Sequence, residues 1–336
     1  MLIKLICVIV FLISHILYAQ TITLGSYLIG QNRKGGDLSK KSLYWIQNVI
    51  YQKGLLSPIY YTGNYGSTDK IDIIIANHIN SFDFTIQTSI FRQFDKRNTY
   101  YVMKKHNVFL PGAGFNVCSS PDIKLNKKIE DDLDNLVRSI RKIKSGIIII
   151  LPEGTRYTPE KKLLSHKYSK DNNLPVFNNV LFPKMKGMWL ITNILTNENR
   201  MGNIIDMSIM IENFKNKKTM ATDLLTKKYG NTLCAINTYG VPPSTIIQDY
   251  DMFKKWFLDI WKNKDNILED MHTVNDTNIY TRLRSKVTIK EITMAVFVIS
   301  LFTYLMVKTK GRYLGYSLII SYIITFIRYK LLKKKL

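Results

Sequence analysis

Short runs of apolar residues, rich in isoleucine and bounded by polar or turn-forming residues, recur through the middle of the chain. Such runs are typical of buried β-strands, although a short one can also be a buried helix segment. They predict strands at residues 71–76, 100–103, 146–151, 204–211 and 233–238. Apolar residues at helical spacing predict helices at residues 43–56, 84–94, 130–144 and 251–271. The pattern favours an α/β fold, in which a central, mostly buried β-sheet is flanked by helices.

Two segments carry more specific expectations. Residues 57–68 are rich in turn-forming residues and are expected to form a loop. The helix at residues 251–271 carries an aromatic and aliphatic stripe, which is expected to pack in the core: Phe253, Trp256, Phe257, Ile260 and Trp261.

Longer apolar runs flank this central region. Residues 2–18 are nearly all apolar, and we favour a retained membrane anchor over residues 1–30, with a cleaved signal peptide as the alternative. Two further apolar runs, at residues 292–307 and 313–327, predict a membrane hairpin at residues 291–328. A re-entrant loop is the alternative to that hairpin.

These runs leave one domain at residues 40–272 and a basic tail at residues 329–336. Basic residues flank the predicted membrane segments, and the positive-inside rule therefore places the domain on the cytosolic side. Lys333 and Lys334 resemble the dilysine signal for retrieval to the endoplasmic reticulum, with a plain charge flank as the alternative. The sequence thus predicts an integral membrane protein, with the endoplasmic reticulum as its expected compartment.

Charge narrows the classes of partner. The 336 residues include 48 Lys and Arg against 25 Asp and Glu, which gives a formal net charge of +23. Biased base composition can contribute to this excess, but a basic surface still suits an anionic partner such as a lipid bilayer or a phosphorylated substrate. No recognisable nucleic-acid-binding motif is present, so no nucleic-acid partner is expected, although a membrane-attached nucleic-acid binder stays an alternative. The cysteines, Cys7, Cys118 and Cys234, are too few and too scattered for a disulfide framework or a zinc site.

Candidate chemistry begins where the first predicted strand ends. Residues 71–76 lead into Asn77 and His78, and Asp83 follows shortly after. On an unbroken helix the His78 and Asp83 side chains would point apart, so the turn-forming residues between them predict a strand, a turn and a helix. A carboxylate that accepts from one ring nitrogen fixes the histidine tautomer and raises the basicity of the other nitrogen. The alternative is a surface histidine beside a helix-capping aspartate.

The strand predicted at residues 146–151 delivers a second candidate motif, Pro152-Glu153-Gly154-Thr155-Arg156. Its glycine allows close approach of the backbone to a ligand, and its arginine fork matches the geometry of a phosphate or carboxylate. The alternative is an ordinary loop between a strand and a helix, with a surface Glu–Arg pair.

Taken together, these motifs resemble those of a known family. Asn77-His78 with Asp83 resembles the NHxxxxD motif of the glycerolipid acyltransferases, the family of 1-acylglycerol-3-phosphate acyltransferase, and residues 152–156 resemble its PEGTR motif. Residues 182–187 are similar to its late proline block. The resemblance covers about residues 44–271. It is strongest to the eukaryotic membrane branch, which includes lysophosphatidic acid, lysocardiolipin and lysophosphatidylinositol acyltransferases.

The resemblance implies a single acyltransferase domain that moves a fatty acyl group from acyl-coenzyme A to the free hydroxyl of a lysophospholipid. The favoured acceptor is 1-acylglycerol-3-phosphate. His78 is implied to be the general base and Asp83 its orienting partner. Acyl-coenzyme A is a co-substrate, and neither a cofactor nor a metal is implied. A non-catalytic lipid-binding protein of the same fold is the alternative from another class.

The resemblance also implies a set of substrate-binding residues: Asn77, Lys127, Lys128, Glu153, Gly154, Thr155, Arg156, Pro183 and Lys184. Within it, Arg156 is expected to bind the acceptor phosphate, and Glu153 and Gly154 to shape the acceptor pocket. The arginine that the family's second motif places after an FxxR-type run is absent here. Lys127 or Lys128 takes its place, which keeps the charge but loses the bidentate geometry.

Overall fold

The structure is a computed structural model. It describes residues 58–80, 83–95, 97–104, 123–125, 133–212, 230–273 and 279–283, together with isolated positions between 293 and 309. The chain divides into two compact units. One of them, here called the sheet unit, comprises Leu56–Val102 and Lys128–Arg284. The other unit includes the short strand β4 (Ile123–Leu125).

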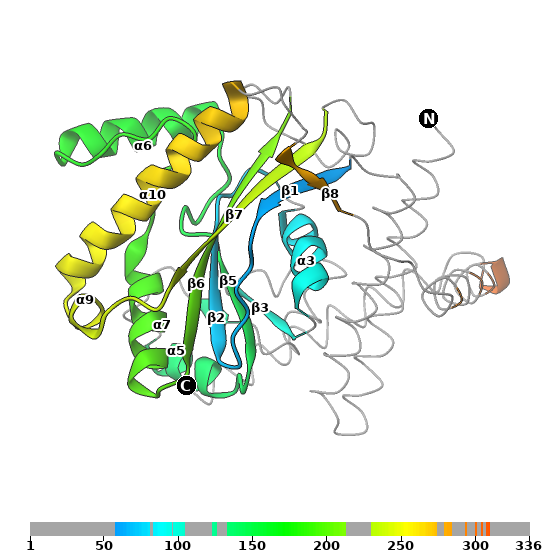
Figure 1. Ribbon diagram of the computed structural model, residues 1–336, viewed down its shortest axis with the longest axis horizontal. Coiled ribbons are helices and arrows are strands. Elements are labelled where there is room, and N and C mark those ends of the chain that lie inside the picture. Colours follow the sequence, from blue (N-terminus) through cyan, green and yellow to red (C-terminus); the bar gives the residue numbers. More distant parts are fainter. Residues whose placement is uncertain are drawn as a thin grey trace. The chain divides into compact units, whose positions relative to one another are not determined.

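The sheet unit is built on one β-sheet, whose strands follow the order β3-β5-β2-β6-β7-β1-β8 (Figure 1). Their bounds are β1 (Ile59–Gly63), β2 (Ile71–Ala76), β3 (Thr99–Lys104), β5 (Gly146–Ile150), β6 (Met201–Ile211), β7 (Thr232–Gly240) and β8 (Thr281–Arg282). The β3–β5, β5–β2, β2–β6 and β7–β1 pairs are parallel, whereas the β6–β7 and β1–β8 pairs are antiparallel. The predicted α/β class is therefore confirmed.

The adjacent strands β2 and β5 form the centre of the core. Ile73 and Ile148 pair in register, and neither has any exposed surface. Isoleucine suits these positions because β-branched side chains pack well on a pleated surface. Strands covered on both faces are uniformly apolar rather than alternating. The strands predicted at residues 71–76 and 146–151 are thus confirmed.

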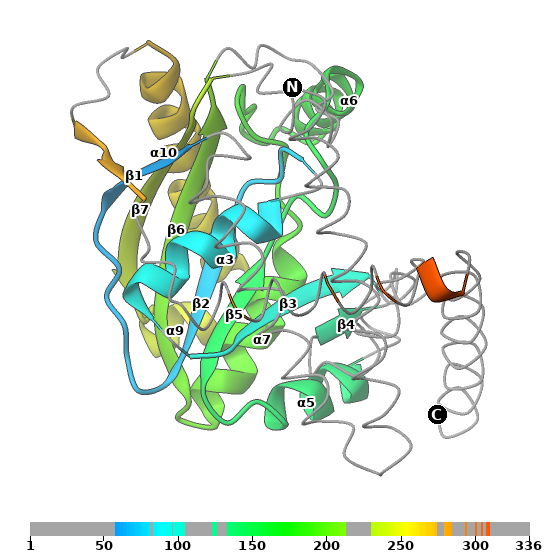
Figure 2. The ribbon, with the colours of Figure 1, turned by 90° about the vertical axis from the view of Figure 1, so that its right-hand side faces the viewer.

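Helices cover both faces of the sheet, with α3 on one face and α7 and α10 on the other (Figures 1 and 2). The helices are α3 (Asp83–Phe94), α5 (Leu133–Arg141), α6 (Pro159–Asp171), α7 (Met185–Asn197), α9 (Ser244–Gln248) and α10 (Tyr250–Thr273). In α10, Phe253, Phe257 and Trp261 are buried, and the rings of Phe257 and Trp261 stack with their centroids 5.8 Å apart. The predicted core role of this stripe is confirmed, although Trp256 is only half-buried.

The other predicted elements also appear, with shifted ends. The strands expected at residues 100–103, 204–211 and 233–238 correspond to β3, β6 and β7. The helix expected at residues 84–94 corresponds to α3, and the helix expected at residues 130–144 corresponds to α5, which ends at Arg141.

The prediction of a loop at residues 57–68 was wrong for its first half, where β1 forms and pairs with β7. Its Ile-Tyr-Tyr-Thr sequence consists of β-branched and aromatic residues, and their strand preference outweighs the turn residues that follow. Helices α6 and α7 were not predicted. For α6 a local signal exists, because Thr158 caps the helix and Pro159 and Glu160 occupy its first turn.

No helix within the described ranges is long and apolar enough to cross a membrane. The anchor predicted at residues 1–30, the helix predicted at residues 43–56 and nearly all of the hairpin predicted at residues 291–328 lie outside the described residues. These membrane segments therefore stay predictions.

Candidate active site

The two predicted motifs meet at the carboxyl ends of β2 and β5, which are parallel neighbours. The backbone N–H of His78 donates to Oε1 of Glu153 at 2.7 Å, and the backbone N–H of Tyr157 donates to the carbonyl oxygen of His78 at 2.7 Å. Parallel strands that leave a sheet at one edge bring such loops together, and ligands commonly bind there in α/β folds. The two motifs therefore lie at one edge of the sheet.

His78 and Asp83 form a hydrogen-bonded pair, with His78 Nδ1 and Asp83 Oδ2 separated by 2.8 Å. Asp83 is the first residue of α3, and its carboxylate also accepts the backbone N–H of Ile79 at 2.8 Å and that of Asn80 at 3.1 Å. The carboxylate thus closes the turn and binds the imidazole at the same time. The Asp83 side chain is 1% exposed and the His78 side chain 22% exposed, so the imidazole reaches solvent from a buried support.

The surroundings of Asp83 determine which imidazole nitrogen carries the proton. Burial raises the pKa of Asp83, whereas hydrogen bonds from His78, Asn80 and Ile79 oppose that rise by stabilising the carboxylate. A carboxylate only accepts hydrogen bonds, so it keeps the proton on Nδ1 of His78. Nε2 is then the nitrogen with a free lone pair, which is the tautomer that a general base requires.

Glu153 is buried beside this pair and joins three segments of the chain. Its Oε1 accepts from the His78 backbone, and its Oε2 accepts the backbone N–H of Leu181 at 3.1 Å. Burial raises the pKa of Glu153 to about 8, against the effect of these two hydrogen bonds. Glu153 therefore orders the end of β2 and the loop before α7, and its side chain does not reach solvent.

Gly154 and Lys184 lie in contact at the same edge. Gly154 has a φ of +64°, in the left-handed region that favours glycine. A Cβ atom at this position would approach Cδ of Lys184 to 3.3 Å. The backbone N–H of Lys184 donates to the carbonyl oxygen of Pro152 at 2.8 Å, and Lys184 is exposed, whereas Pro183 is buried. The late proline block, residues 182–187, thus packs on the turn formed by residues 152–156.

Asn77 is engaged with the sheet. Its side-chain nitrogen donates to the carbonyl oxygen of Ile209 at 2.8 Å, and its side-chain oxygen accepts the backbone N–H of the same residue at 2.8 Å. Asn77 is 1% exposed and joins the end of β2 to β6. This contact fixes the strand end from which His78 projects, while substrate binding by Asn77 stays a prediction.

The remaining predicted ligands differ in how much the structure says of them. Arg156 is exposed and Thr155 half-buried on the turn that follows β5. Lys127 and Lys128 lie outside the described residues. Where the chain is described, no group of three or more His, Cys, Asp and Glu residues could hold a metal ion.

A buried ion pair behind the site was not predicted. Nζ of Lys264 in α10 lies 2.5 Å from Oδ1 of Asp206 in β6 and donates to the carbonyl oxygen of Met207 at 2.7 Å. Both charged side chains are fully buried, and Asp206 pairs in register with Ile75 of β2. The signal that could have found the pair is a lysine on the apolar face of a helix, three residues after Trp261.

Comparison with known proteins singles out the same region. Residues 61–184 match the family model described as acyltransferase. Lysophosphatidylinositol acyltransferase 10 of Caenorhabditis elegans is 23% identical over 269 residues, which cover 76% of this chain and 68% of the relative. A probable 1-acyl-sn-glycerol-3-phosphate acyltransferase 5 of Arabidopsis thaliana is 23% identical over 274 residues, with the same shares, 76% and 68%.

Two further comparisons cover different shares. Human 1-acyl-sn-glycerol-3-phosphate acyltransferase gamma is 24% identical over 202 residues, or 59% of this chain and 52% of the relative. The crystal structure of the 1-acyl-sn-glycerophosphate acyltransferase PlsC from Thermotoga maritima aligns with a TM-score of 0.45 and 14% identity, covering 78% of this chain and 95% of that one. The segment matched by the family model contains His78, Asp83 and the turn from Pro152 to Arg156.

Proposed function

Because the chain carries a domain of the acyltransferase family, we propose that it moves a fatty acyl group from acyl-coenzyme A to the free hydroxyl of a lysophospholipid. The favoured acceptor is 1-acylglycerol-3-phosphate, which would give phosphatidic acid. Lysophosphatidylinositol and lysocardiolipin are the alternative acceptors. The names of the relatives support the lysophospholipid class. The apolar runs outside residues 40–272 support a membrane location, and their charged flanks favour a cytosolic domain at the endoplasmic reticulum.

The observation that carries this proposal is the His78–Asp83 pair at the carboxyl edge of the sheet. With Asp83 holding Nδ1, Nε2 of His78 removes the proton from the acceptor hydroxyl as its oxygen attacks the thioester carbonyl carbon. The carbon–sulfur bond then breaks, the coenzyme A thiolate leaves, and the imidazolium returns the proton to the thiolate. The transfer is direct, so the reaction needs no acyl intermediate on the protein.

Cationic side chains at the same edge support an acceptor that bears a phosphate. Arg156 and Lys184 are both exposed beside the turn that contains Gly154. An arginine can donate two parallel, charge-assisted hydrogen bonds to a phosphate, and a lysine adds charge. Lys127 or Lys128 would supply a further cation. Phosphatidic acid precursors and lysophosphatidylinositol share the phosphate, so these residues support the acceptor class, and the head group is decided by measurement.

The direct test offers radiolabelled oleoyl-coenzyme A and a panel of lysophospholipids to membranes that carry the full chain. We expect labelled product from at least one lysophospholipid, and loss of that product in membranes with an equal amount of the His78→Ala variant. Preferred labelling of 1-acylglycerol-3-phosphate over lysophosphatidylinositol and lysocardiolipin would identify the acceptor. Equal product from both membranes contradicts the mechanism, and no product with any acceptor favours the non-catalytic lipid-binding alternative.

A further inference from the structure

Helix α6 follows the turn of the candidate site directly, and three large apolar side chains are exposed on its outer surface among charged residues. The helix begins after Thr158, whose side chain accepts the backbone N–H of Lys161 at 3.3 Å. Leu163, Leu164 and Tyr168 expose 70%, 60% and 51% of their surface. Positions four apart on a helix are neighbours, so Leu164 and Tyr168 lie on one face, with Leu163 beside them.

The other side of α6 presents polar residues to the protein. Ser169 is 1% exposed. Oγ of Ser165 accepts the backbone N–H of Phe182 at 2.8 Å, and Nε2 of His166 lies 2.7 Å from the carbonyl oxygen of Phe177. A surface helix of a soluble protein normally buries its apolar stripe and exposes its polar residues. In α6 the large apolar side chains are exposed instead, beside charged ones.

Basic residues surround the exposed apolar side chains. Lys161, Lys167 and Lys170 are exposed on α6, and the exposed acids on the same helix are Glu160 and Asp171. Apolar side chains among lysines suit the boundary between anionic head groups and acyl chains. There the apolar side chains are buried in lipid, and each lysine gains from the negative surface potential.

We propose that the α6 face, formed by Leu163, Leu164, Lys167 and Tyr168, contacts the surface of a bilayer that contains anionic phospholipid. The apolar runs at the two ends of the sequence favour a bilayer, rather than a protein, as the partner of this face. Figures 1 and 2 both show α6 at the upper end of the sheet unit. The contact is independent of any reaction, whereas its use in delivering acceptor rests on the proposed function.

Hydrogen bonds connect the α6 face to the candidate site. The loop before α7 donates to α6 through the backbone N–H of Phe182 and to Glu153 through the backbone N–H of Leu181. Glu153 in turn accepts from the backbone of His78. A bilayer against α6 would therefore hold the carboxyl edge of the sheet close to the lipid that supplies a lysophospholipid.

The test places a fluorescent label on the α6 face of the full chain in lipid nanodiscs of phosphatidylcholine and phosphatidylserine. The label is attached to Leu164→Cys in a chain that also carries Cys7→Ser and Cys118→Ser, because Cys234 is buried and does not react. The matched control is Met252→Cys in α10, since Met252 is an apolar residue with 47% exposure. Both variants are first required to keep the unfolding temperature of the parent chain.

Lipids that carry a nitroxide on the acyl chain are expected to quench the label at position 164 at least about twofold more than the label at position 252. A water-soluble quencher should show the opposite order. Equal lipid quenching at the two positions overturns the proposal. Protection of position 164 from both quenchers also overturns it, because protein, either a second copy or another segment of this chain, then covers the face. Neither readout needs turnover, so failure of the proposed acyl transfer does not affect this result.

The lysines allow a separate test of the lipid charge. Replacing Lys161, Lys167 and Lys170 by Gln should lower the lipid quenching of the label at position 164 in anionic nanodiscs to the level seen in pure phosphatidylcholine. Each lysine near an anionic surface contributes about fivefold to the binding constant. Quenching that is the same in both lipids before and after the substitutions overturns the assignment to anionic lipid.

Discussion

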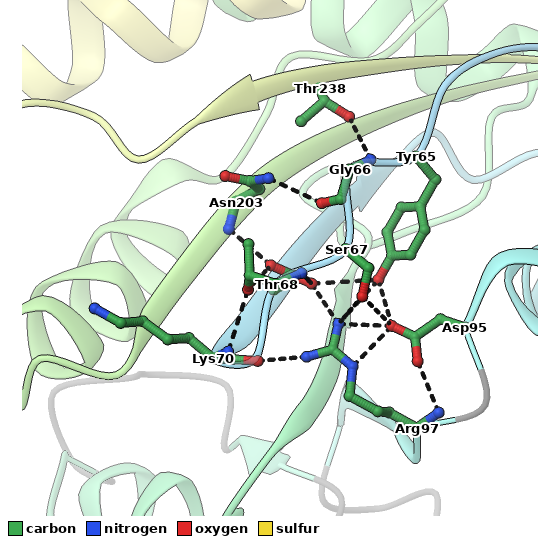
Figure 3. A network of polar contacts seen from close by, with 10 residues as sticks. Tyr65, Gly66, Ser67, Thr68, Lys70, Asp95, Arg97, Asn203 and Thr238 are labelled. Atoms are coloured by element: carbon green, nitrogen blue, oxygen red, sulfur yellow. Dashed lines mark hydrogen bonds and ion pairs between the residues drawn. The ribbon is translucent and has the colours of Figure 1, made fainter.

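The two ends of β2 bury carboxylates in opposite electrostatic surroundings. At the amino end, Asp72 and Asp95 share the guanidinium of Arg97, with nitrogen–oxygen distances of 2.5 Å and 2.6 Å (Figure 3). At the carboxyl end, Asp83 and Glu153 accept hydrogen bonds from backbone N–H groups and from an imidazole. One end matches its carboxylates with a permanent cation, whereas the other stabilises them with neutral donors.

This difference changes how strongly the carboxylates hold protons. Burial raises the pKa of Asp95, but hydrogen bonds from Arg97 and Tyr65 and the charge of Arg97 together outweigh burial and bring the pKa below its ordinary value. At the other end, burial raises the pKa of Glu153 to about 8. A network whose charges are matched stabilises one conformation. Carboxyl groups with shifted pKa values beside a partly exposed imidazole are typical of sites that transfer protons. The comparison supports a structural role for the amino end and a chemical role for the carboxyl end.

The network at the amino end also fixes the loop that precedes β2 (Figure 3). Asp72 accepts from Oγ1 of Thr68 at 2.7 Å and from the backbone N–H of Asn203 at 2.7 Å. The Asn203 side chain then donates to the carbonyl oxygen of Gly66 at 2.8 Å. These bonds join the start of β2 to β6 and leave the buried carboxylate with several donors, as a stable interior requires.

The largest expected effect comes from removing the base at the carboxyl end. His78→Ala should lower acyl transfer about 10²–10⁴-fold, because the acceptor hydroxyl loses the group that takes its proton. Asp83→Asn should also lower the rate, since an amide can donate to Nδ1 and select the wrong tautomer. Initial rates at saturating substrates, normalised to folded protein, measure both effects. His272→Ala is the control, because His272 is exposed at the end of α10. A His78→Ala rate equal to that of the control rejects the base assignment.

Removing the Arg97 cation from the network at the amino end of β2 should lower stability without changing the rate of acyl transfer. Arg97→Met leaves Asp72 and Asp95 without their shared cation, which should lower the free energy of unfolding by about 3 kcal/mol, the low end for a buried pair, since Arg97 is partly exposed. The turnover number per folded molecule should stay unchanged. Thermal unfolding in detergent measures the loss. Arg141→Met serves as the control, because exposed ion pairs contribute only about 0–1 kcal/mol. Equal unfolding temperatures for the two variants would show that the network is not needed for stability.

Local sequence was enough to predict that His78 and Asp83 pair at the carboxyl end of β2. His78 and Asp83 are separated by one turn, so strand, turn and helix preferences alone bring them together. The contact between His78 and Glu153 required only that two buried strands be parallel neighbours, which uniformly apolar isoleucine runs favour. The amino end was not predicted, because Arg97 meets Asp72 only after β3 and β2 have taken their places in the sheet. The same non-local dependence hid the pair of Lys264 and Asp206.

The fold shows the same division. The strands β2 and β5 can be predicted from the sequence because isoleucine occupies most of their positions, as is typical of strands that are buried on both faces. Strand β1 ends at Gly63 and is followed by further turn-forming residues, which hide the strand preference of its Ile-Tyr-Tyr-Thr run. Helix α6 has no apolar stripe facing the core, so the spacing of apolar residues could not predict this helix.

Substitutions of the exposed Arg156 test whether the carboxyl end of the sheet binds the acceptor. Arg156→Ala removes the charge and the fork, and Arg156→Lys removes only the fork. If Arg156 binds the acceptor phosphate, both variants should raise the KM for acceptor, by about 10- to 150-fold for the alanine variant. The KM for acyl-coenzyme A should change little. Arg138→Ala removes an exposed charge from α5 and controls for net charge. An Arg156→Ala variant that unfolds early but keeps its acceptor KM would assign the arginine a structural role.

The smallest expected effect is a change in pH dependence at Glu153. Its pKa is about 8 in the folded chain and near the ordinary value of about 4.3 when unfolded. Between these values the folded state holds one more proton than the unfolded state, so this group makes stability fall as pH rises from about 5 to about 8. Glu153→Gln removes that titration, and its amide also replaces one acceptor by a donor, which lowers stability by about 1–3 kcal/mol at every pH. The unfolding temperature of the variant should therefore be lower at pH 5 but decline less toward pH 8.

Glu198→Gln is the control, because hydrogen bonds from Arg141 and Arg200 lower the pKa of Glu198, whose titration is then complete below this range. Parallel curves for the parent chain and Glu153→Gln would show that Glu153 is ionised across the range, and that the backbone donors of His78 and Leu181 outweigh its burial.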